Sequence, residues 1–317
     1  MLMIVSLALL LAAPQDVSPE VGAVMDRSRR QAQERRREEA EAARAARNAQ
    51  QGQGGTFSPA DPAAPASLPI PPQYAARFQA CIDKAIDDPA AGAAEANAWQ
   101  IAGGTFYARQ CEGFAYARSG RWTAALAALR QAAEQAEVAN DPASARLWAQ
   151  AGNAALAGGD AAAARNAFDA AIAHGMADGI DKGETYLDRA RALVALGEPA
   201  AARKDIDTAL AQVPDDPLAW LLSATLARRM NDLALARDHI AKAVKLASDD
   251  ASVALEEGNI AMLSGQEDAA RVAWERAVTL SPDSAQAKSA SQNLAQLAAQ
   301  PAAAPSHEAP PTESRPR

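Results

Sequence analysis

Small and large apolar positions recur at regular intervals between about residue 73 and residue 298. Each copy of the pattern contains a residue that tolerates a left-handed turn, at Gly120, Gly159, Gly197, Asn231 and Gly265. Seven residues before each turn stands a small residue: Gly113, Gly152, Ala190, Ala224 and Gly258. Alanines follow each turn after five and twelve residues, and between them lies a large apolar residue, at Leu129, Phe168, Ile206, Ile240 and Trp274. The pattern predicts five copies of a helix–turn–helix unit.

The spacing gives these units a physical reason to stack. The turns are 34 residues apart in the last three units and 38 or 39 residues apart in the earlier ones. Small residues let two antiparallel helices cross closely, and the bulky residue then fills the gap between units. One pair cannot bury its own apolar stripe, so successive pairs must stack. We also expect a divergent helix pair at 73–87 and 90–102 and a polar capping helix at 284–300.

The repeated positions resemble the tetratricopeptide repeat family. The resemblance rests on Trp148, Gly152, Ala164, Phe168 and Ala171 in one unit, Tyr186, Ala190, Ala202, Ile206, Ala209 and Pro214 in another, and Gly258, Ala270, Trp274, Ala277 and Pro282 in the last. Ser223 and Glu257 depart from the family pattern, which usually has leucine there. The resemblance implies an all-α fold, a right-handed superhelical solenoid of about five to six repeats. It also implies that ligand peptides bind the concave surface, which the first helix of each pair lines.

The repeats divide the chain into five parts. We expect a signal peptide at 1–13, a charged Ala/Arg/Glu-rich helix at 14–50, a flexible Pro/Gly linker at 51–72, the repeat solenoid at 73–298 and a disordered tail at 301–317. Within the solenoid we place the repeats at about 73–105, 106–144, 145–182, 183–216, 217–250 and 251–284, followed by the capping helix at 284–300.

The first residues indicate export. The uncharged run Leu2–Ala13 is too short to span a bilayer and has the length of the apolar region of a secretory signal peptide. Because Pro14 disfavours cleavage directly after Ala13, we expect cleavage after Ala12. We therefore predict a periplasmic protein. The alternatives are an uncleaved anchor that leaves the chain facing the periplasm, the only membrane contact we expect, and a cytosolic protein.

Composition and charge exclude several functional classes. Alanine makes up more than a quarter of the chain and aromatic residues only 4%, which favours closely packed helices over a sheet-based core. The net charge of −8 is unsuited to nucleic-acid binding. Two cysteines and three scattered histidines cannot build a typical zinc site. Since no catalytic or cofactor-binding motif is present, we expect a non-catalytic protein without metal or cofactor.

Cys81 and Cys111 are the two cysteines of the chain. They fall on the first helices of neighbouring pairs, which lie side by side in a stack. In an oxidising compartment an even number of cysteines favours a disulfide. Two buried reduced thiols, or a catalytic thiol, are the alternatives.

Helical periodicity maps a set of polar residues onto the expected concave face: Arg118, Arg146, Gln150, Asn153, Asp188, Arg191, Arg228, Arg229, Glu256 and Asn259. Arg191, Arg228 and Arg229 would form a positive strip that suits an acidic or C-terminal peptide. The alternative is that these are ordinary solvated helix residues. Ala149 and Leu187 replace basic residues of the clamp that chaperone-binding relatives use, so the sequence does not support binding of a chaperone C-terminus.

Two functional classes follow. The first is a protein–protein interaction scaffold of the bacterial cell envelope that holds a protein or peptide partner in its groove. The second is an accessory subunit of an envelope enzyme, secretion or cell-division machine, as repeat proteins serve beside Tol–Pal or in cytochrome c maturation. The architecture alone does not separate them.

Overall fold

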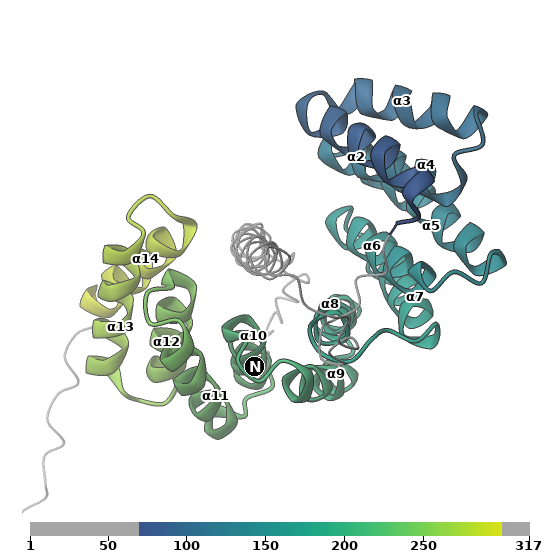
Figure 1. Ribbon diagram of the computed structural model, residues 1–317. Helices are drawn as coiled ribbons and strands as arrows, with labels where there is room; N and C mark the ends of the chain where they lie inside the picture. The colour runs from purple at the N-terminus through teal and green to yellow at the C-terminus, as the bar shows by residue number, and fades with distance from the viewer. Residues whose placement is uncertain (1–69, 300–317) are drawn as a thin grey trace, which may run out of the picture. The chain divides into compact units, whose positions relative to one another are not determined.

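A computed structural model describes residues 70–299, and thirteen α-helices and no strand occur among them (Figure 1). The helices are α2 (Pro72–Asp87), α3 (Pro89–Ile101), α4 (Thr105–Arg118), α5 (Trp122–Val138), α6 (Ala143–Ala157), α7 (Ala161–Ala173), α8 (Ile180–Ala195), α9 (Pro199–Gln212), α10 (Pro217–Arg229), α11 (Leu233–Leu246), α12 (Ala251–Leu263), α13 (Glu267–Leu280) and α14 (Ala285–Ala299). The all-α prediction is thus confirmed. The expected signal peptide, charged helix and tail, and nearly all of the linker, lie outside the described residues.

The helices belong to two compact units, one that ends at Leu246 and one that begins at Ala247. In the first unit, α4 packs on α5, α6 on α7, α8 on α9 and α10 on α11, while α2 packs on both α3 and α4. In the second unit α12 packs on α13, and α14 contacts both. Consecutive helices therefore form the hairpins that the repeated sequence positions predict, with an additional pair, α2 and α3, before them.

In three hairpins a glycine of the first helix faces the bulky residue of the second helix. A Cβ atom placed on Gly152 would lie 2.6 Å from Cε1 of Phe168, and one on Gly113 would lie 2.5 Å from Cγ of Leu129. At the corresponding place in the second unit, Gly258 lies against the indole of Trp274. Such distances leave no room for a methyl group, so these glycines set how closely the paired helices approach.

The turns between paired helices use the left-handed backbone that the sequence predicts. Gly159 has a φ of 79° and Asn231 a φ of 63°. Asparagine adopts this conformation at lower cost than most residues with a side chain. Asn231 therefore makes the same turn as the glycines of the other repeats.

Polar residues replace leucine at two repeat positions, and each has a partner on the second helix of its own hairpin. In the first unit Ser223 Oγ lies 2.6 Å from Nδ1 of His239. In the second unit Glu257 forms an ion pair with Arg276. These contacts provide the polar groups with partners where the family normally has apolar packing.

Arg189 joins three helices of the first unit. Its Nε and Nη2 atoms donate to the two carboxylate oxygens of Asp205 at 2.7 Å, and its Nη1 donates to Asp169 at 2.8 Å. Asp205 is buried. The hydrogen bond to Asp205, together with the nearby charges of Asp205 and Asp169, raises the pKa of Arg189 despite partial burial. This bidentate pair fastens α8 to α9 and links both to α7.

Cys81 of α2 and Cys111 of α4 form a disulfide in the structure, with their Cα atoms 6.3 Å apart. Both residues are completely buried. The bond is the pairing that the sequence predicted. It connects residues 30 positions apart, and in the chain-entropy model closing a loop of that length stabilises the fold by about 3.6 kcal/mol.

The alanine positions of the repeat give a matched test of the packing. Ala164 of α7 is fully buried, whereas Ala162 of the same helix is exposed. We expect Ala164→Leu to lower the free energy of unfolding by about 1–3 kcal/mol, because the added atoms cannot fit between the paired helices. Ala162→Leu should change it by less than about 0.5 kcal/mol. Chemical denaturation of both variants checks this, and equal losses would contradict the assigned register.

His239 should make stability depend on pH. Burial lowers its pKa below the ordinary value of 6.5, and the charges of Arg203 and Lys242 lower it further, while Asp207 and Asp238 oppose the shift. As the pH falls through about 6.5, the unfolded chain takes up a proton that the folded chain still excludes, so the free energy of unfolding decreases. We expect the melting temperature to fall more between about pH 7.5 and 5.5 for the natural chain than for His239→Asn. An identical fall in both proteins would contradict this.

Candidate functional site

The polar residues predicted for the groove lie on first helices of the hairpins. Arg118 is on α4, Arg146, Gln150 and Asn153 are on α6, Asp188 and Arg191 on α8, Arg228 and Arg229 on α10, and Glu256 and Asn259 on α12. The last two belong to the second unit. The predicted set therefore divides into eight residues of the first unit and two of the second.

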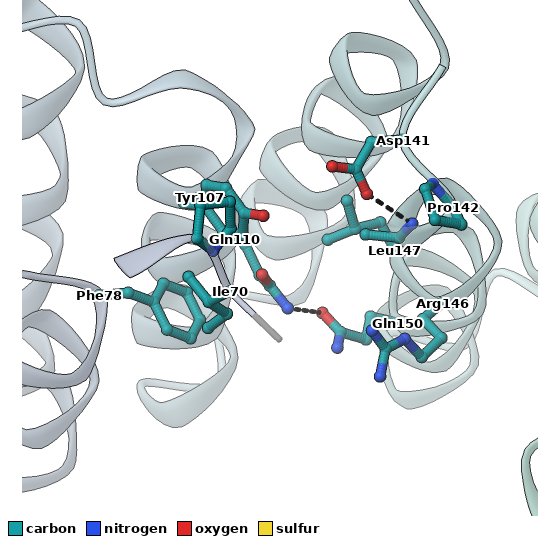
Figure 2. A pocket seen from close by; sticks show the side chains of 11 residues that line it. Ile70, Phe78, Tyr107, Gln110, Asp141, Pro142, Arg146, Leu147 and Gln150 are labelled. Atoms are coloured by element: carbon teal, nitrogen blue, oxygen red, sulfur yellow. Dashed lines mark hydrogen bonds between the residues drawn. The ribbon is translucent and has the colours of Figure 1, made fainter. Parts of the chain in front are cut away.

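A pocket of about 330 Å³ opens between three first helices at the beginning of the first unit (Figure 2). Its walls come from α2 and the residues just before it, from α4, and from the start of α6 with the turn before that helix. They consist of Ile70, Pro71, Phe78, Tyr107, Gln110, Asp141, Pro142, Ala143, Arg146, Leu147 and Gln150. Only Arg146 and Gln150 belong to the residues that the sequence predicted, so the structure brings two of the ten together in this pocket.

Hydrogen bonds fix the polar side of the pocket. Gln110 Nε2 donates to Gln150 Oε1 at 3.1 Å, which joins α4 to α6 across the pocket (Figure 2). Asp141 Oδ1 accepts the backbone N–H of Ala143 at 2.8 Å and so caps the beginning of α6. These bonds hold both glutamine side chains and the Asp141 carboxylate in place.

The charges of the pocket are Asp141 and Arg146. Within residues 70–299 the Arg146 guanidinium forms no hydrogen bond or ion pair. Burial raises the pKa of Tyr107, and the charge of Asp141 raises it further, while Arg146 acts in the opposite direction. Tyr107 therefore stays neutral at physiological pH.

The arginines of the predicted positive strip have different surroundings. Arg191 Nη1 donates to the buried carboxylate of Asp188 at 3.1 Å. Arg229 is exposed at the end of α10. Outside the strip, Arg118 of α4 is also exposed, and its Nη2 donates to the backbone carbonyl of Ile86 at 3.4 Å. Because Asp188 balances Arg191, the strip carries less positive charge than the sequence alone suggests.

In the second unit Asn259 connects three helices. Its Oδ1 accepts hydrogen bonds from Trp274 Nε1 and Asn293 Nδ2, both at 3.1 Å. Its Nδ2 donates a hydrogen bond to Glu256 Oε2 at 3.3 Å. Glu256 is buried. These contacts give Asn259 and Glu256 a structural role that the sequence analysis did not foresee.

The pocket residues on α2 and α4 were missed by sequence reasoning, which mapped no residue before Arg118 to the concave face. One signal was available. Tyr107 stands 39 residues before Arg146, the same interval that separates Gly120 from Gly159. The register thus places Tyr107 on the same helical face as Arg146. Nothing in the register indicated that α2 would supply Phe78 as the opposite wall.

Two further findings concern the described residues alone. Residues 70–299 contain no group of three or more histidine, cysteine, aspartate or glutamate side chains that could hold a metal ion. None of the helices in this range combines the length and the apolar character needed to cross a membrane.

Several solved structures share the fold. The chain is 14% identical to the protein in a functional characterisation of pilF of Pseudomonas aeruginosa, with a TM-score of 0.55, covering 70% of this chain and 99% of that one. A chain of the Cut9–Hcn1 hetero-tetramer of the APC/C is 12% identical, with a TM-score of 0.52, covering 71% and 46%. YrrB, described as a TPR protein with an unusual peptide-binding site, is 18% identical, with a TM-score of 0.47, covering 62% and 96%.

Sequence comparison gives the family. No curated protein matches the chain at a significant level. The profile of the tetratricopeptide repeat matches residues 112–178, 187–251 and 221–285, which together make up more than half of the chain. The matched ranges contain α5 to α7 and α9 to α13 in full and parts of α4 and α8. The chain therefore belongs to the tetratricopeptide repeat family.

Proposed function

We propose that the chain is a non-catalytic scaffold that binds a peptide segment of a protein partner on its first helices. The observation that carries the proposal is the pocket between α2, α4 and α6, in which the Arg146 guanidinium has no partner within residues 70–299. A concave site with a few fixed polar groups is typical of ligand binding. The family fold supports this role, because stacked hairpins present a long row of first helices to a ligand.

The Ser223–His239 contact supplies no catalytic alternative. A serine hydroxyl close to a histidine nitrogen has the arrangement of a nucleophile and its base. Ser223, however, has 0% of its surface exposed. A substrate cannot reach its hydroxyl, so the pair acts as a contact between α10 and α11.

The partner segment is proposed to be acidic or to end in a free carboxylate. Arg146 in the pocket and the exposed Arg229 on α10 are the groups that support this chemistry. Arginine binds carboxylate through two parallel hydrogen bonds. Arg191 contributes less, because it already bonds to Asp188.

Site-specific photo-cross-linking in the producing cell tests the location of binding. We expect a photoreactive residue at Gln150 of α6 or Ala195 of α8, both exposed on first helices, to form an adduct with a partner protein. The matched controls are Gln131 of α5 and Lys204 of α9, which are also exposed but lie on second helices. These controls should form no adduct.

Adducts from the second-helix positions alone would contradict the proposal. A further position, Gln33, tests the charged segment at 14–50. If adducts form from Gln33 and from no first-helix position, the charged segment is the binding element and the groove is a spacer.

We infer that the scaffold works outside the cytoplasm, in the periplasm of a bacterial envelope. The uncharged run Leu2–Ala13 supports export. The buried disulfide between Cys81 and Cys111 also supports it, because such bonds persist in oxidising compartments.

A pair of reporter fusions after residue 72 tests this inference. Alkaline phosphatase, which needs an oxidising compartment, should be active at that position, and β-galactosidase, which needs the cytoplasm, should be inactive. Enzyme assays on whole cells measure both. The reverse pattern would contradict export.

A further inference from the structure

The pocket between α2, α4 and α6 has one apolar side and one polar side. The rings of Phe78 and Tyr107, whose centroids lie 6.1 Å apart, form the apolar side together with Leu147. Gln110, Gln150 and Arg146 form the polar side (Figure 2). A volume of about 330 Å³ is at the lower end of ligand pockets and suits one or two side chains rather than a folded domain.

Within residues 70–299, the two glutamines that line the pocket retain a donor and an acceptor that their mutual hydrogen bond does not use. Gln110 Nε2 donates a hydrogen bond to Gln150 Oε1. This leaves the Gln110 Oε1 atom as an acceptor and the Gln150 Nε2 atom as a donor. One acceptor beside one donor matches the N–H and C=O groups of an extended peptide.

The charged residues of the pocket favour one orientation of an acidic ligand. Figure 2 shows Asp141 on the upper side of the pocket and Arg146 beside Gln150 on the lower side. The Asp141 carboxylate caps α6 and repels a second carboxylate. Arg146 attracts one. An acid group on the ligand is therefore directed to the Arg146 end.

We propose that this pocket anchors an extended segment of the partner in which an apolar side chain stands next to a carboxylate. The apolar side chain enters between Phe78, Tyr107 and Leu147, the peptide group bonds to Gln110 and Gln150, and the carboxylate pairs with Arg146. The assignment rests on the proposed function and names the chemistry of the ligand.

The disulfide holds one wall of this site. Of the sixteen residues of α2, only Cys81 and Ala85 are buried, so the helix contributes few large side chains to the core. Its other attachments include the half-buried rings of Tyr74 and Phe78 against Tyr107, the Arg77 guanidinium over Trp99, and the ion pairs of Arg77 and Lys84 with Glu95 of α3. Exposed ion pairs of this kind contribute little to stability. Breaking the Cys81–Cys111 bond should therefore loosen the Phe78 wall and weaken binding.

Selection from a phage library of random dodecapeptides on the full chain tests the proposal. We expect enriched peptides to carry an aromatic or branched aliphatic residue within two positions of aspartate, glutamate or a free C-terminus. The tightest peptide, made with a fluorescent label, should bind Arg146→Gln at least about tenfold more weakly by fluorescence anisotropy, because a charge-assisted pair is lost. The matched control is Arg237→Gln, an exposed arginine of the second helix α11, which should bind as the natural chain does.

The Cys81→Ser, Cys111→Ser double variant should also bind the peptide more weakly. Its circular-dichroism spectrum at the assay temperature shows whether the helices are retained. If the spectrum is lost, the natural chain with and without a reductant, assayed below its melting temperature, replaces the variant. Unchanged affinity without the disulfide would overturn the role of α2 as a wall.

The remaining outcomes separate this proposal from the proposed function. Peptides that lack the apolar–acidic pair, or that bind Arg146→Gln and the natural chain equally, would overturn the pocket assignment. A failure to enrich any peptide would overturn it as well. Enrichment of copies of this chain's own sequence would make the occupant a segment of this protein rather than a partner. In each case adducts from Ala195 would still support binding on first helices.

Discussion

The close approach of a glycine to a large apolar residue, seen in three of the hairpins, is the contact on which the rest of the arrangement depends. Gly113 lies against Leu129 and Gly152 against Phe168, with no space for another methyl group. This contact fixes the distance between the two helices of a pair. It also fixes their rotation, because the glycine face of the first helix must point at its partner. Gln150 and Arg146 then lie away from the partner helix and line the pocket.

Polar contacts between helices provide the specificity of helix pairing that an alanine-rich core lacks. Alanine packs closely but distinguishes poorly between neighbouring helices, and aromatic residues form only 4% of the chain. Buried or half-buried pairs such as Arg189–Asp205 and Ser223–His239 have defined geometry and each joins a particular first helix to its own second helix. Their net contribution to stability is modest because burial of polar groups is costly. Their directionality favours one pairing of helices over a slipped one.

The sequence predicted the helices well and the site poorly, for a physical reason. Periodicity and turn residues are local, so they predicted the hairpins and placed Cys81 and Cys111 on adjacent first helices. The face of a helix on which a residue lies can be predicted in the same way. This is why the predicted set includes Arg146 and Gln150, which line the pocket. The partner of a side chain is not local. Periodicity mapped Asn259 to a ligand surface, but its amide oxygen already accepts hydrogen bonds from Trp274 and Asn293.

The position of the disulfide follows from the sparse packing of α2 among residues 70–299. The helices α4 to α9 have neighbouring hairpins to bury their apolar faces, whereas α2 packs mainly on α3 and α4. The buried residues of α2, Cys81 and Ala85, are small and provide little apolar area. A covalent bond compensates, because it removes conformations from the unfolded chain without requiring apolar area. The disulfide can therefore hold α2 as an aromatic wall, with Phe78 facing Tyr107, beside the polar groups of the pocket.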